Sequence, residues 1–378
     1  MRMIYEIDES CLAILNTKEN MDAIAFFEQL ALDRKKCKNI VVANREVFSE
    51  LSQNTKLSEV SRNIYRVLGG RMCEKKMLLK ITKKYCRLVA RNIDEKVYRE
   101  GEHEIILLDI RKAANKDFTS YTLMLAENEE DIEFYKLIGI YFLKKNKLAN
   151  LNINFENRHG GGGTMSNILD RIVNEKSKMC LCIVDSDRKY KDDTPGETMQ
   201  RVKKVEERYP REYYDVILLE IHEIENMIPI SVLEKVIKNM KLPEEGLSFA
   251  KYLLQYDNTL STPYFYFDLK MGIHRNAFIL KENANQEIEK KFRKKELYRR
   301  YWKLYIEDYG IVIDENANEF LIDGICQRIL RYSLKYMQEM NKEDKLASIQ
   351  VCDPIETIWN QIGEQVYCWG CVGGRIAV

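Results

Sequence analysis

Five acidic residues in the middle of the sequence are the most promising carriers of chemistry. Carboxylates that converge without an equal number of cations repel one another strongly, because the effective dielectric constant inside a protein is low. A divalent cation removes that repulsion, and ligand sets made of oxygen suit Mg²⁺ or Mn²⁺ better than zinc. The residues predicted to bind such ions are Glu127, Asp131, Asp185, Asp187 and Glu225.

Three apolar segments lead into these acids and must position them. The segments TSYTLMLAE, KMCLCIVDSD and YYDVILLEIHEIEN occupy 119–127, 178–187 and 213–226. Their continuous apolar parts are typical of strands buried on both faces of a parallel sheet. Helices are predicted between them, over 131–146 and near 197–208. This alternation predicts a doubly wound α/β layer, in which sites form beyond the carboxyl ends of the strands.

The spacing within each group predicts which carboxylates meet. Glu127 closes the first strand and Asp131 falls one turn into the next helix, so both can face the space above the sheet. Asp185 and Asp187 are two positions apart in a segment expected to be extended, which places them on one side with Ser186 turned away. We therefore expect the acids to line one edge of the sheet.

The order and spacing of these motifs resemble a known family. Glu127 with Asp131, followed by the paired Asp185 and Asp187, is similar to the Toprim domain of topoisomerases, primases and nucleases of the overcoming-lysogenization-defect (OLD) type. The run 223–229 resembles the acidic segment of OLD-type and related defence Toprim proteins rather than that of topoisomerases. The resemblance covers roughly a third of the chain.

One position departs from the family pattern. The run 126–131 is similar to the family's signature of glutamate, glycine and then aspartate, but Asn128 stands where the family usually has glycine. Asn adopts left-handed backbone more readily than most residues that carry a Cβ. The turn after the first strand is therefore still expected.

The acidic cluster predicts metal-assisted cleavage of phosphodiester bonds. One ion, held by Glu127 with Asp185, would activate water or a hydroxyl nucleophile. A second ion, held by Asp131 with Glu225, would steady the leaving oxygen, and Asp187 could serve either ion. The predicted cofactor is therefore a pair of Mg²⁺ or Mn²⁺ ions.

A lysine in the second half of the chain is a further candidate. OLD-type nucleases have a lysine after their acidic motifs, and the resemblance implies that Lys270 takes this place. A lysine beside carboxylate-bound metal can neutralise the pentavalent phosphate or protonate the leaving oxygen. Asp268 is expected to be its partner, and an exposed lysine without a role is the alternative.

The segment 290–303 interleaves basic and aromatic residues. Cations with aromatic rings are what a surface needs to follow a nucleic-acid backbone and stack its bases. The same segment also fits an ordinary amphipathic helix whose aromatic residues, such as Trp302, are buried. The residues predicted to contact nucleic acid are Arg293, Lys294, Arg299 and Arg300.

Composition limits the classes of protein that fit. The 378 residues carry a formal net charge of +1, so any affinity for nucleic acid must come from local patches. No apolar run approaches the roughly 18 residues of a membrane span, and the ten cysteines are scattered. We therefore expect a cytoplasmic protein with reduced thiols. Cys368 and Cys371 have half the spacing of a zinc knuckle, with two buried thiols as the alternative.

Three regions are predicted along the chain. Residues 1–118 form a mixed α/β region of unassigned role, in which 60–91 is expected to be helical with a break at Gly69–Gly70. Residues 119–235 form the Toprim-like catalytic domain. Residues 236–378 form a mainly helical region that contains the basic and aromatic segment.

The resemblance implies a nuclease that acts on DNA, tRNA or other RNA. OLD-type proteins carry an ATPase on the same chain, and this sequence has no Walker motif. We therefore expect an effector of anti-phage defence that is controlled by a companion ATPase and can self-associate. Two alternatives stay open: a catalytically inactive module that binds nucleic acid or acts as a scaffold, and a small-molecule phosphotransferase, for which a deep pocket is expected.

Overall fold

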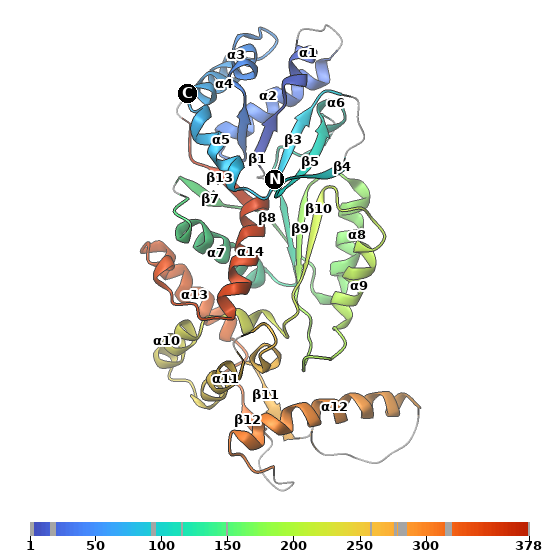
Figure 1. Cartoon of the computed structure of the whole chain (residues 1–378), viewed down its shortest axis with the longest axis vertical. Coiled ribbons are helices and arrows are strands. Elements are labelled where there is room, and N and C mark those ends of the chain that lie inside the picture. The colour runs from blue at the N-terminus through green and yellow to red at the C-terminus, as the bar shows by residue number, and fades with distance from the viewer. Residues whose placement is uncertain are drawn as a thin grey trace. The chain divides into compact units, whose positions relative to one another are not determined.

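The chain folds into two compact units, seen here in a computed structural model (Figure 1). Unit 1 comprises Met1–Ile183, Arg201–Ile217 and Ile362–Val378, and unit 2 comprises Val184–Gln200 and Leu218–Gln361. The structure describes residues 4–15, 20–91, 96–114, 116–148, 150–257, 259–275, 278, 286–313 and 320–376, and it leaves aside the side chains of 72–76, 162 and 286–292. The three regions expected from the sequence stay a prediction.

Unit 1 begins with a five-stranded sheet in the order β2-β1-β3-β5-β4. Neighbouring strands are parallel except β4, which pairs antiparallel with β5. The strands are β1 (Ile4–Ile7), β2 (Ile40–Ala43), β3 (Lys84–Val89), β4 (Lys96–Glu100) and β5 (His103–Asp109). The helices of this region are α1 (Leu12–Leu15), α2 (Met21–Lys35), α3 (Arg45–Gln53), α4 (Glu59–Gly70), α5 (Met72–Ile81) and α6 (Ile110–Ala113). This region is mixed α/β, as expected.

One element of this region was predicted wrongly. The helical pattern expected over 60–91 breaks after Gly70, as predicted, but α5 ends at Ile81 and β3 follows. The strand lies between β1 and β5, and its backbone is paired on both sides. Lys84 in β3 is buried, and its ammonium group lies 2.5 Å from Glu104 Oε1 and 2.9 Å from Asp215 Oδ2. These two carboxylates offset the cost of burying its charge. Pairing within the sheet thus outweighs the basic, helix-like spacing of the sequence.

The second sheet has four strands in the order β10-β9-β6-β8. The three predicted strands are all present, and β6 is parallel to both β8 and β9. The strands are β6 (Leu123–Ala126), β8 (Glu156–His159), β9 (Cys180–Val184) and β10 (Tyr214–Leu218). The helices that alternate with them are α7 (Glu129–Lys145), α8 (Met165–Glu175) and α9 (Glu197–Glu206). The fold is therefore α/β, with a layer of mostly parallel strands flanked by helices.

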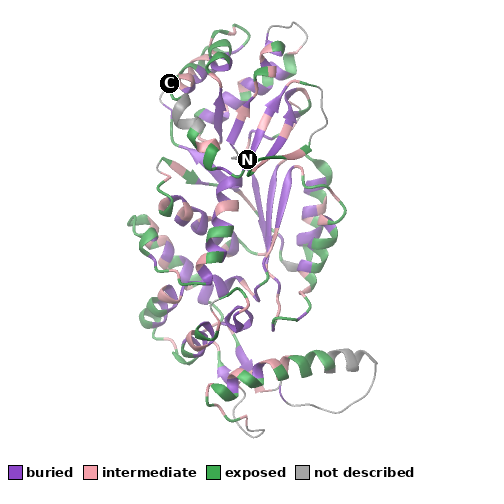
Figure 2. Ribbon diagram, in the orientation of Figure 1, coloured by how far each residue is buried: buried purple, intermediate pink, exposed green. Residues whose placement is uncertain are grey.

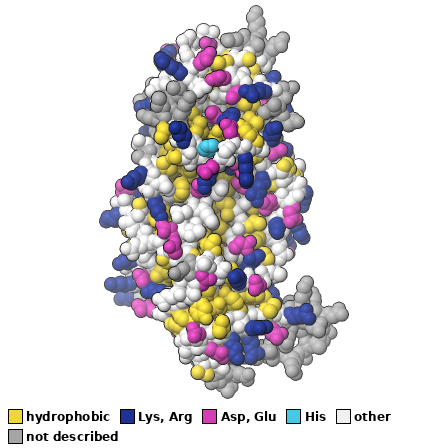
Figure 3. Space-filling view, viewed as in Figure 1, with side chains coloured by type: hydrophobic (Ala, Val, Ile, Leu, Met, Phe, Trp, Pro, Cys, Tyr) yellow, Lys and Arg dark blue, Asp and Glu magenta, His cyan; other side chains and the backbone are white. Residues whose placement is uncertain are grey.

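Burial explains why these segments form strands. Every residue of β6 and of β9 is buried, as continuous apolar runs covered on both faces require (Figure 2). The antiparallel pair of β7 (Leu151–Ile153) and β13 (Cys371–Gly373) adds the last residues of unit 1 to its core. Thr122 Oγ1 donates to Trp369 O over 2.8 Å at this junction. On the face in Figure 3, basic and acidic side chains are interspersed, in keeping with the net charge of +1.

Unit 2 is mainly helical, as expected for residues 236–378. Its core contains Phe249, Phe267 and Trp302, whose rings pack edge to face or tilted. Its helices are α10 (Ile230–Met240), α11 (Glu245–Tyr256), α12 (Gln286–Asp308), α13 (Ile329–Lys342) and the first part of α14 (Ile355–Gly370), and β11 (Gly272–His274) pairs antiparallel with β12 (Phe320–Asp323). Within the described part of the chain, none of the helices combines the length and apolar character of a membrane crossing.

Candidate metal centre

Three loops of unit 2 carry the acidic residues. Loop 1 follows β9, loop 2 follows β10, and loop 3 follows the short 3-10 helix η4. The loops and the helix are loop 1 (185–187), loop 2 (221–226), loop 3 (267–272) and η4 (Pro263–Tyr266). Sites at the ends of strands in α/β sheets are commonly built from such loops.

Backbone hydrogen bonds join loop 1 to loop 2. Ser186 N donates to Ile221 O over 3.0 Å, and Asp187 N donates to His222 O over 2.8 Å. The side chain of Asp185 is held as well, because Oδ2 accepts a hydrogen bond of 3.2 Å from the Ile224 amide. Asp185 and Asp187 are therefore fixed against the segment that carries the other acids.

The extended conformation predicted for loop 1 is wrong at Asp187. Asp187 has a φ of 53°, in the left-handed region, and Ser186 is fully buried with its hydroxyl donating to Ile221 O. Gly196 makes room for the Asp187 carboxyl group, since a Cβ at Gly196 would lie 2.2 Å from Asp187 Oδ2. The direction of the Asp187 side chain is therefore set by a turn, and not by the alternation of side chains along an extended strand.

Asn226 holds loop 2 to loop 3. Its side-chain oxygen accepts from Glu223 N over 3.2 Å, and its Nδ2 donates to Tyr264 O over 2.8 Å and to Phe267 O over 2.9 Å. The residue is fully buried, so each of these bonds replaces one that water would have made. Asn226 thus fixes Glu223 relative to the segment that carries Asp268.

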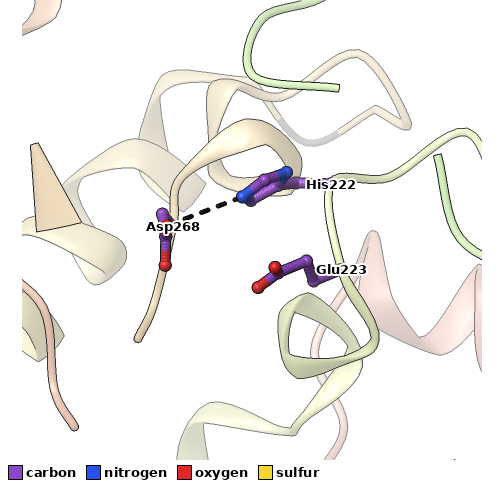
Figure 4. Close-up of side chains that lie close together, drawn as sticks. All are labelled: His222, Glu223 and Asp268. Atoms are coloured by element: carbon purple, nitrogen blue, oxygen red, sulfur yellow. Dashed lines mark ion pairs between the residues drawn. The ribbon is translucent and has the colours of Figure 1, made fainter. Parts of the chain in front are cut away.

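His222, Glu223 and Asp268 come close enough to hold one metal ion. Each offers a ligand atom, and these atoms all lie within 4.8 Å of one another (Figure 4). His222 Nε2 lies 3.8 Å from Asp268 Oδ2, too long for a hydrogen bond. His222 is 3% exposed, and neither ring nitrogen has a hydrogen-bond partner among the described residues. Buried polar atoms without partners are rare, and a bound cation would give a ring nitrogen of His222 a partner.

Lys270 lies against two glutamates of loop 2. Its Nζ is 2.8 Å from Glu223 Oε2 and 3.5 Å from Glu225 Oε1. Burial acts to lower the pKa of Lys270, but the charges of Glu225 and Glu223 outweigh it, so the pKa is raised. Asp268, the partner expected from the sequence, faces His222, and its Oδ1 accepts from Lys270 N over 3.0 Å. Lys270 is therefore a fixed cation of the centre.

The centre holds more negative charge than its own cations balance. Glu225 is 5% exposed, and its Oε2 has no hydrogen-bond partner among the described residues. Burial raises the pKa of Glu225, and the charge of Glu223 adds to the shift. Burial likewise raises the pKa of Asp187, again with a contribution from Glu223. A divalent cation would reverse both shifts, because it favours the charged form of each carboxyl group.

The remaining predicted ligands, Glu127 and Asp131, belong to unit 1. Asp131 is the third residue of α7, and its Oδ2 accepts from Asn128 N over 3.0 Å in a capping box. Asn128 is extended, with φ −129° and ψ 163°, so the left-handed turn considered for this position is absent there. Asp131 thus has a structural role at the start of α7. That Glu127 and Asp131 share an ion with the acids of unit 2 stays a prediction.

The glycine run after β8 is occupied by backbone contacts. Gly160 N donates to Ala126 O over 2.9 Å, and Gly161 N donates to Glu127 O over 3.0 Å. Gly161 has a φ of +53°, which glycine adopts without strain. These two amides are therefore engaged in fixing the turn after β6.

Helix α12 buries part of the basic and aromatic segment. Trp302 is 1% exposed, Ile306 is fully buried, and Trp302 Nε1 donates to Lys189 O over 2.9 Å. The expectation of an amphipathic helix with buried aromatic residues is therefore confirmed for Trp302.

The four cations predicted to contact nucleic acid lie on the same helix. Arg293, Lys294 and Arg300 are exposed and Arg299 is half-buried, while Lys294 Nζ lies 3.0 Å from Asp193 Oδ1. Their contact with nucleic acid stays a prediction.

The two late cysteines are poorly suited to zinc. Cys368 and Cys371 are both buried, and burial raises the pKa of Cys368 to about 12. Zinc binds the thiolate form. Among the described residues, the one group of His, Cys, Asp and Glu side chains that could hold an ion is the His222 group. The structure favours two buried thiols.

A cavity of about 550 Å³ adjoins the centre within unit 2. His222 and Asp268 form part of its wall, so the cavity and the proposed metal site share two side chains. Its volume falls in the range of roughly 300–1,000 Å³ that is usual for sites of small ligands.

No protein-family model, no curated protein and no solved structure matches this chain. The resemblance to Toprim proteins therefore rests on the sequence motifs alone.

Sequence reasoning did not assign His222, Glu223 or Asp268 as ligands. Glu223 stands two positions before Glu225, in the run that resembles the family, and it could have been found there. Asp268 stands two positions before Lys270 in an aromatic run. No local pattern indicates that this run returns to the end of β10.

Proposed function

We propose that this protein is a nuclease that uses Mn²⁺ or Mg²⁺ to cleave phosphodiester bonds in DNA or RNA. The observation that carries the proposal is the convergence of His222, Glu223 and Asp268 on one point, with Lys270 beside it. The donor set is dominated by carboxylate oxygen, which suits Mg²⁺ and Mn²⁺, and its single imidazole favours Mn²⁺ of the two. The residues present therefore fit the proposed ion.

Each side chain of the centre has a definable task. The ion would supply an activated water and would offset charge that develops on the phosphate. Lys270 adds a fixed positive charge, and its raised pKa favours charge stabilisation over proton donation. The hydrogen bonds of Asn226 hold loop 2 against loop 3, so that Glu223 and Asp268 stay within reach of one ion. A second ion, held with Glu127 and Asp131, is part of the same proposal.

The biological setting is proposed from the resemblance to stand-alone Toprim effectors. The protein would act in the cytoplasm as the nuclease of an anti-phage system, held in check by a companion ATPase, and it would self-associate. The nine cysteines whose side chains the structure describes are all free thiols, which supports a reducing compartment.

Incubation of the purified protein with plasmid DNA, single strands and total RNA tests the nuclease. We expect cleavage with Mn²⁺ or Mg²⁺, either alone or with the neighbouring gene product, and loss of cleavage in Glu223→Gln and Asp268→Asn. Glu234→Gln is the matched control, because Glu234 lies on the surface of α10 in unit 2 and pairs with Lys251. Intact substrates under every condition would leave the scaffold or binding module as the better assignment.

A phosphotransferase acting on a small molecule is the second candidate. The cavity beside His222 and Asp268 favours it, because a pocket of this size can hold a single small ligand. Release of inorganic phosphate from nucleoside monophosphates or sugar phosphates, with polymers left intact, would decide for this activity.

A further inference from the structure

We infer that the cavity beside the metal centre receives the base of an unpaired nucleotide, so that the substrate is single-stranded nucleic acid. The inference rests on the proposed nuclease function and deepens it by naming the substrate class. His222 and Asp268 line the cavity and also belong to the metal centre. A base in the cavity would therefore place its own phosphate beside the proposed ion.

The walls of the cavity present aromatic side chains on a packed support. Tyr190, Tyr266 and Tyr298 line it. The ring centroids of Tyr190 and Tyr266 lie 6.1 Å and 6.3 Å from the ring centroid of Tyr301. The ring centroid of Tyr298 lies 6.3 Å from that of Trp302. Rings that are held by other rings lose little freedom when a base stacks on them, and stacking does not depend on the identity of the base.

Three cations stand at the same cavity. Lys189, Lys294 and Lys295 line it, and all three are exposed at the surface. Lys294 forms an ion pair with Asp193, with 3.0 Å between Lys294 Nζ and Asp193 Oδ1, and Asp193 is nearly fully buried. Exposed lysines beside an aromatic pocket suit the phosphates that flank a bound base.

The size of the cavity lies in the range of pockets that hold one small ligand, which suits a single base. Enzymes whose pockets take a single base must act on a strand that is already unpaired or must extrude the base from the stack. Extrusion costs a few kcal/mol in a paired duplex and little in a single strand. Single strands, or unpaired loops of folded RNA, are therefore the favoured ligands.

Binding of labelled oligonucleotides to the full-length protein in Ca²⁺ tests the inference separately from cleavage. The probes are one sequence as single-stranded DNA, single-stranded RNA and duplex, and the same single strand with abasic positions. We expect the single strands to bind more tightly than the duplex, and the loss of one base to weaken binding by roughly 5- to 150-fold. Comparison of the affinities for single-stranded DNA and single-stranded RNA identifies which of the two nucleic acids is preferred. Equal affinity for the abasic strand or for the duplex would overturn the inference.

Variants of one wall residue complete the test. Tyr298→Leu should lose the preference for strands that carry bases, and Tyr298→Phe should keep it because the ring remains. Tyr256→Leu is the matched control, since Tyr256 is 46% exposed in unit 2 and does not line the cavity. The urea midpoint of each variant shows whether it is folded.

The two proposals can fail separately. Equal cleavage of duplex and single strand would overturn the inference and leave the nuclease standing. Base-dependent binding without cleavage in Mn²⁺ would support the pocket and remove the nuclease. A free nucleoside monophosphate that binds as tightly as the oligonucleotide would overturn the inference in favour of a small-molecule substrate.

Discussion

Lys270 Nζ lies 2.8 Å from Glu223 Oε2, so a residue of loop 3 supplies a positive charge to the acids of loop 2. The sequence indicated Lys270 as a candidate but assigned it to Asp268, which lies against His222. The ion pair gives Lys270 a place in the proposed reaction.

Lys270→Met should lower the cleavage rate by roughly 10²- to 10³-fold, because it removes a fixed charge aimed at the reacting phosphate. Lys270→Arg should restore part of the rate, since it restores the charge. Initial rates on a labelled single strand in Mn²⁺ measure both variants. A Met variant as fast as the parent protein would remove Lys270 from the mechanism.

Asn226→Ala should lower the free energy of unfolding by roughly 1–3 kcal/mol, because Tyr264 O and Phe267 O lose their buried donor. Urea unfolding at neutral pH measures the loss. The variant should also lose most of the thermal stabilisation that Mn²⁺ gives, since loop 2 and loop 3 would no longer be held together. Asn239→Ala, at an exposed position of α10, is the control, and an equal effect there would contradict the role of Asn226.

Asp131 can be tested for its two roles. Asp131→Ala should cost on the order of 1 kcal/mol of stability, because the amide of Asn128 loses its acceptor. Asp131→Asn keeps an acceptor oxygen and should be nearly as stable as the parent protein. If Asp131 also binds the second ion, both variants should be inactive. An active Asn variant would restrict Asp131 to capping α7.

Lys84 should make stability depend on alkaline pH. Burial acts to lower the pKa of Lys84, but Asp215 and Glu104 outweigh it, so the pKa is raised in the folded state. A raised pKa contributes stability that is fully present below the unfolded value of about 10.4 and is lost as pH rises through the folded value. Lys84→Met should cost roughly 3–5 kcal/mol near neutral pH, because two carboxylates lose their buried partner.

The pH series for Lys84 compares urea unfolding of the parent protein and Lys84→Met between about pH 8 and about pH 11.5. The difference between the two should shrink at the alkaline end. A difference that stays constant across the series would show that the ammonium charge does not carry the stabilisation.

The parallel strands of the central layer could be predicted because their signal is local. The segments of β6, β9 and β10 are continuous apolar runs that end in acids, and helical periodicity separates them. Strand β3 was missed because KYCRLV carries two basic residues and follows a basic helix. Its place between β1 and β5 depends on pairing that no local pattern records.

The centre was predictable in part for the same reason. Asp185, Asp187 and Glu225 stand next to strand ends, so topology brings them to one region. Asp268 and Lys270 come from a distant segment, which is held there by the hydrogen bonds of Asn226 and by the amide of His222 donating to Phe265 O over 2.7 Å. The conformation of Asp187 was missed because the left-handed turn depends on the space beside Gly196.

Because the two units are interleaved in the sequence, the ribosome completes unit 2 before unit 1. Unit 2 is interrupted by Arg201–Ile217, and unit 1 resumes only at Ile362. The strand β13, which pairs with β7, therefore leaves the ribosome after all of unit 2. A polypeptide translated as far as Gln361 therefore contains every residue of unit 2, while the last strand of unit 1 is still missing.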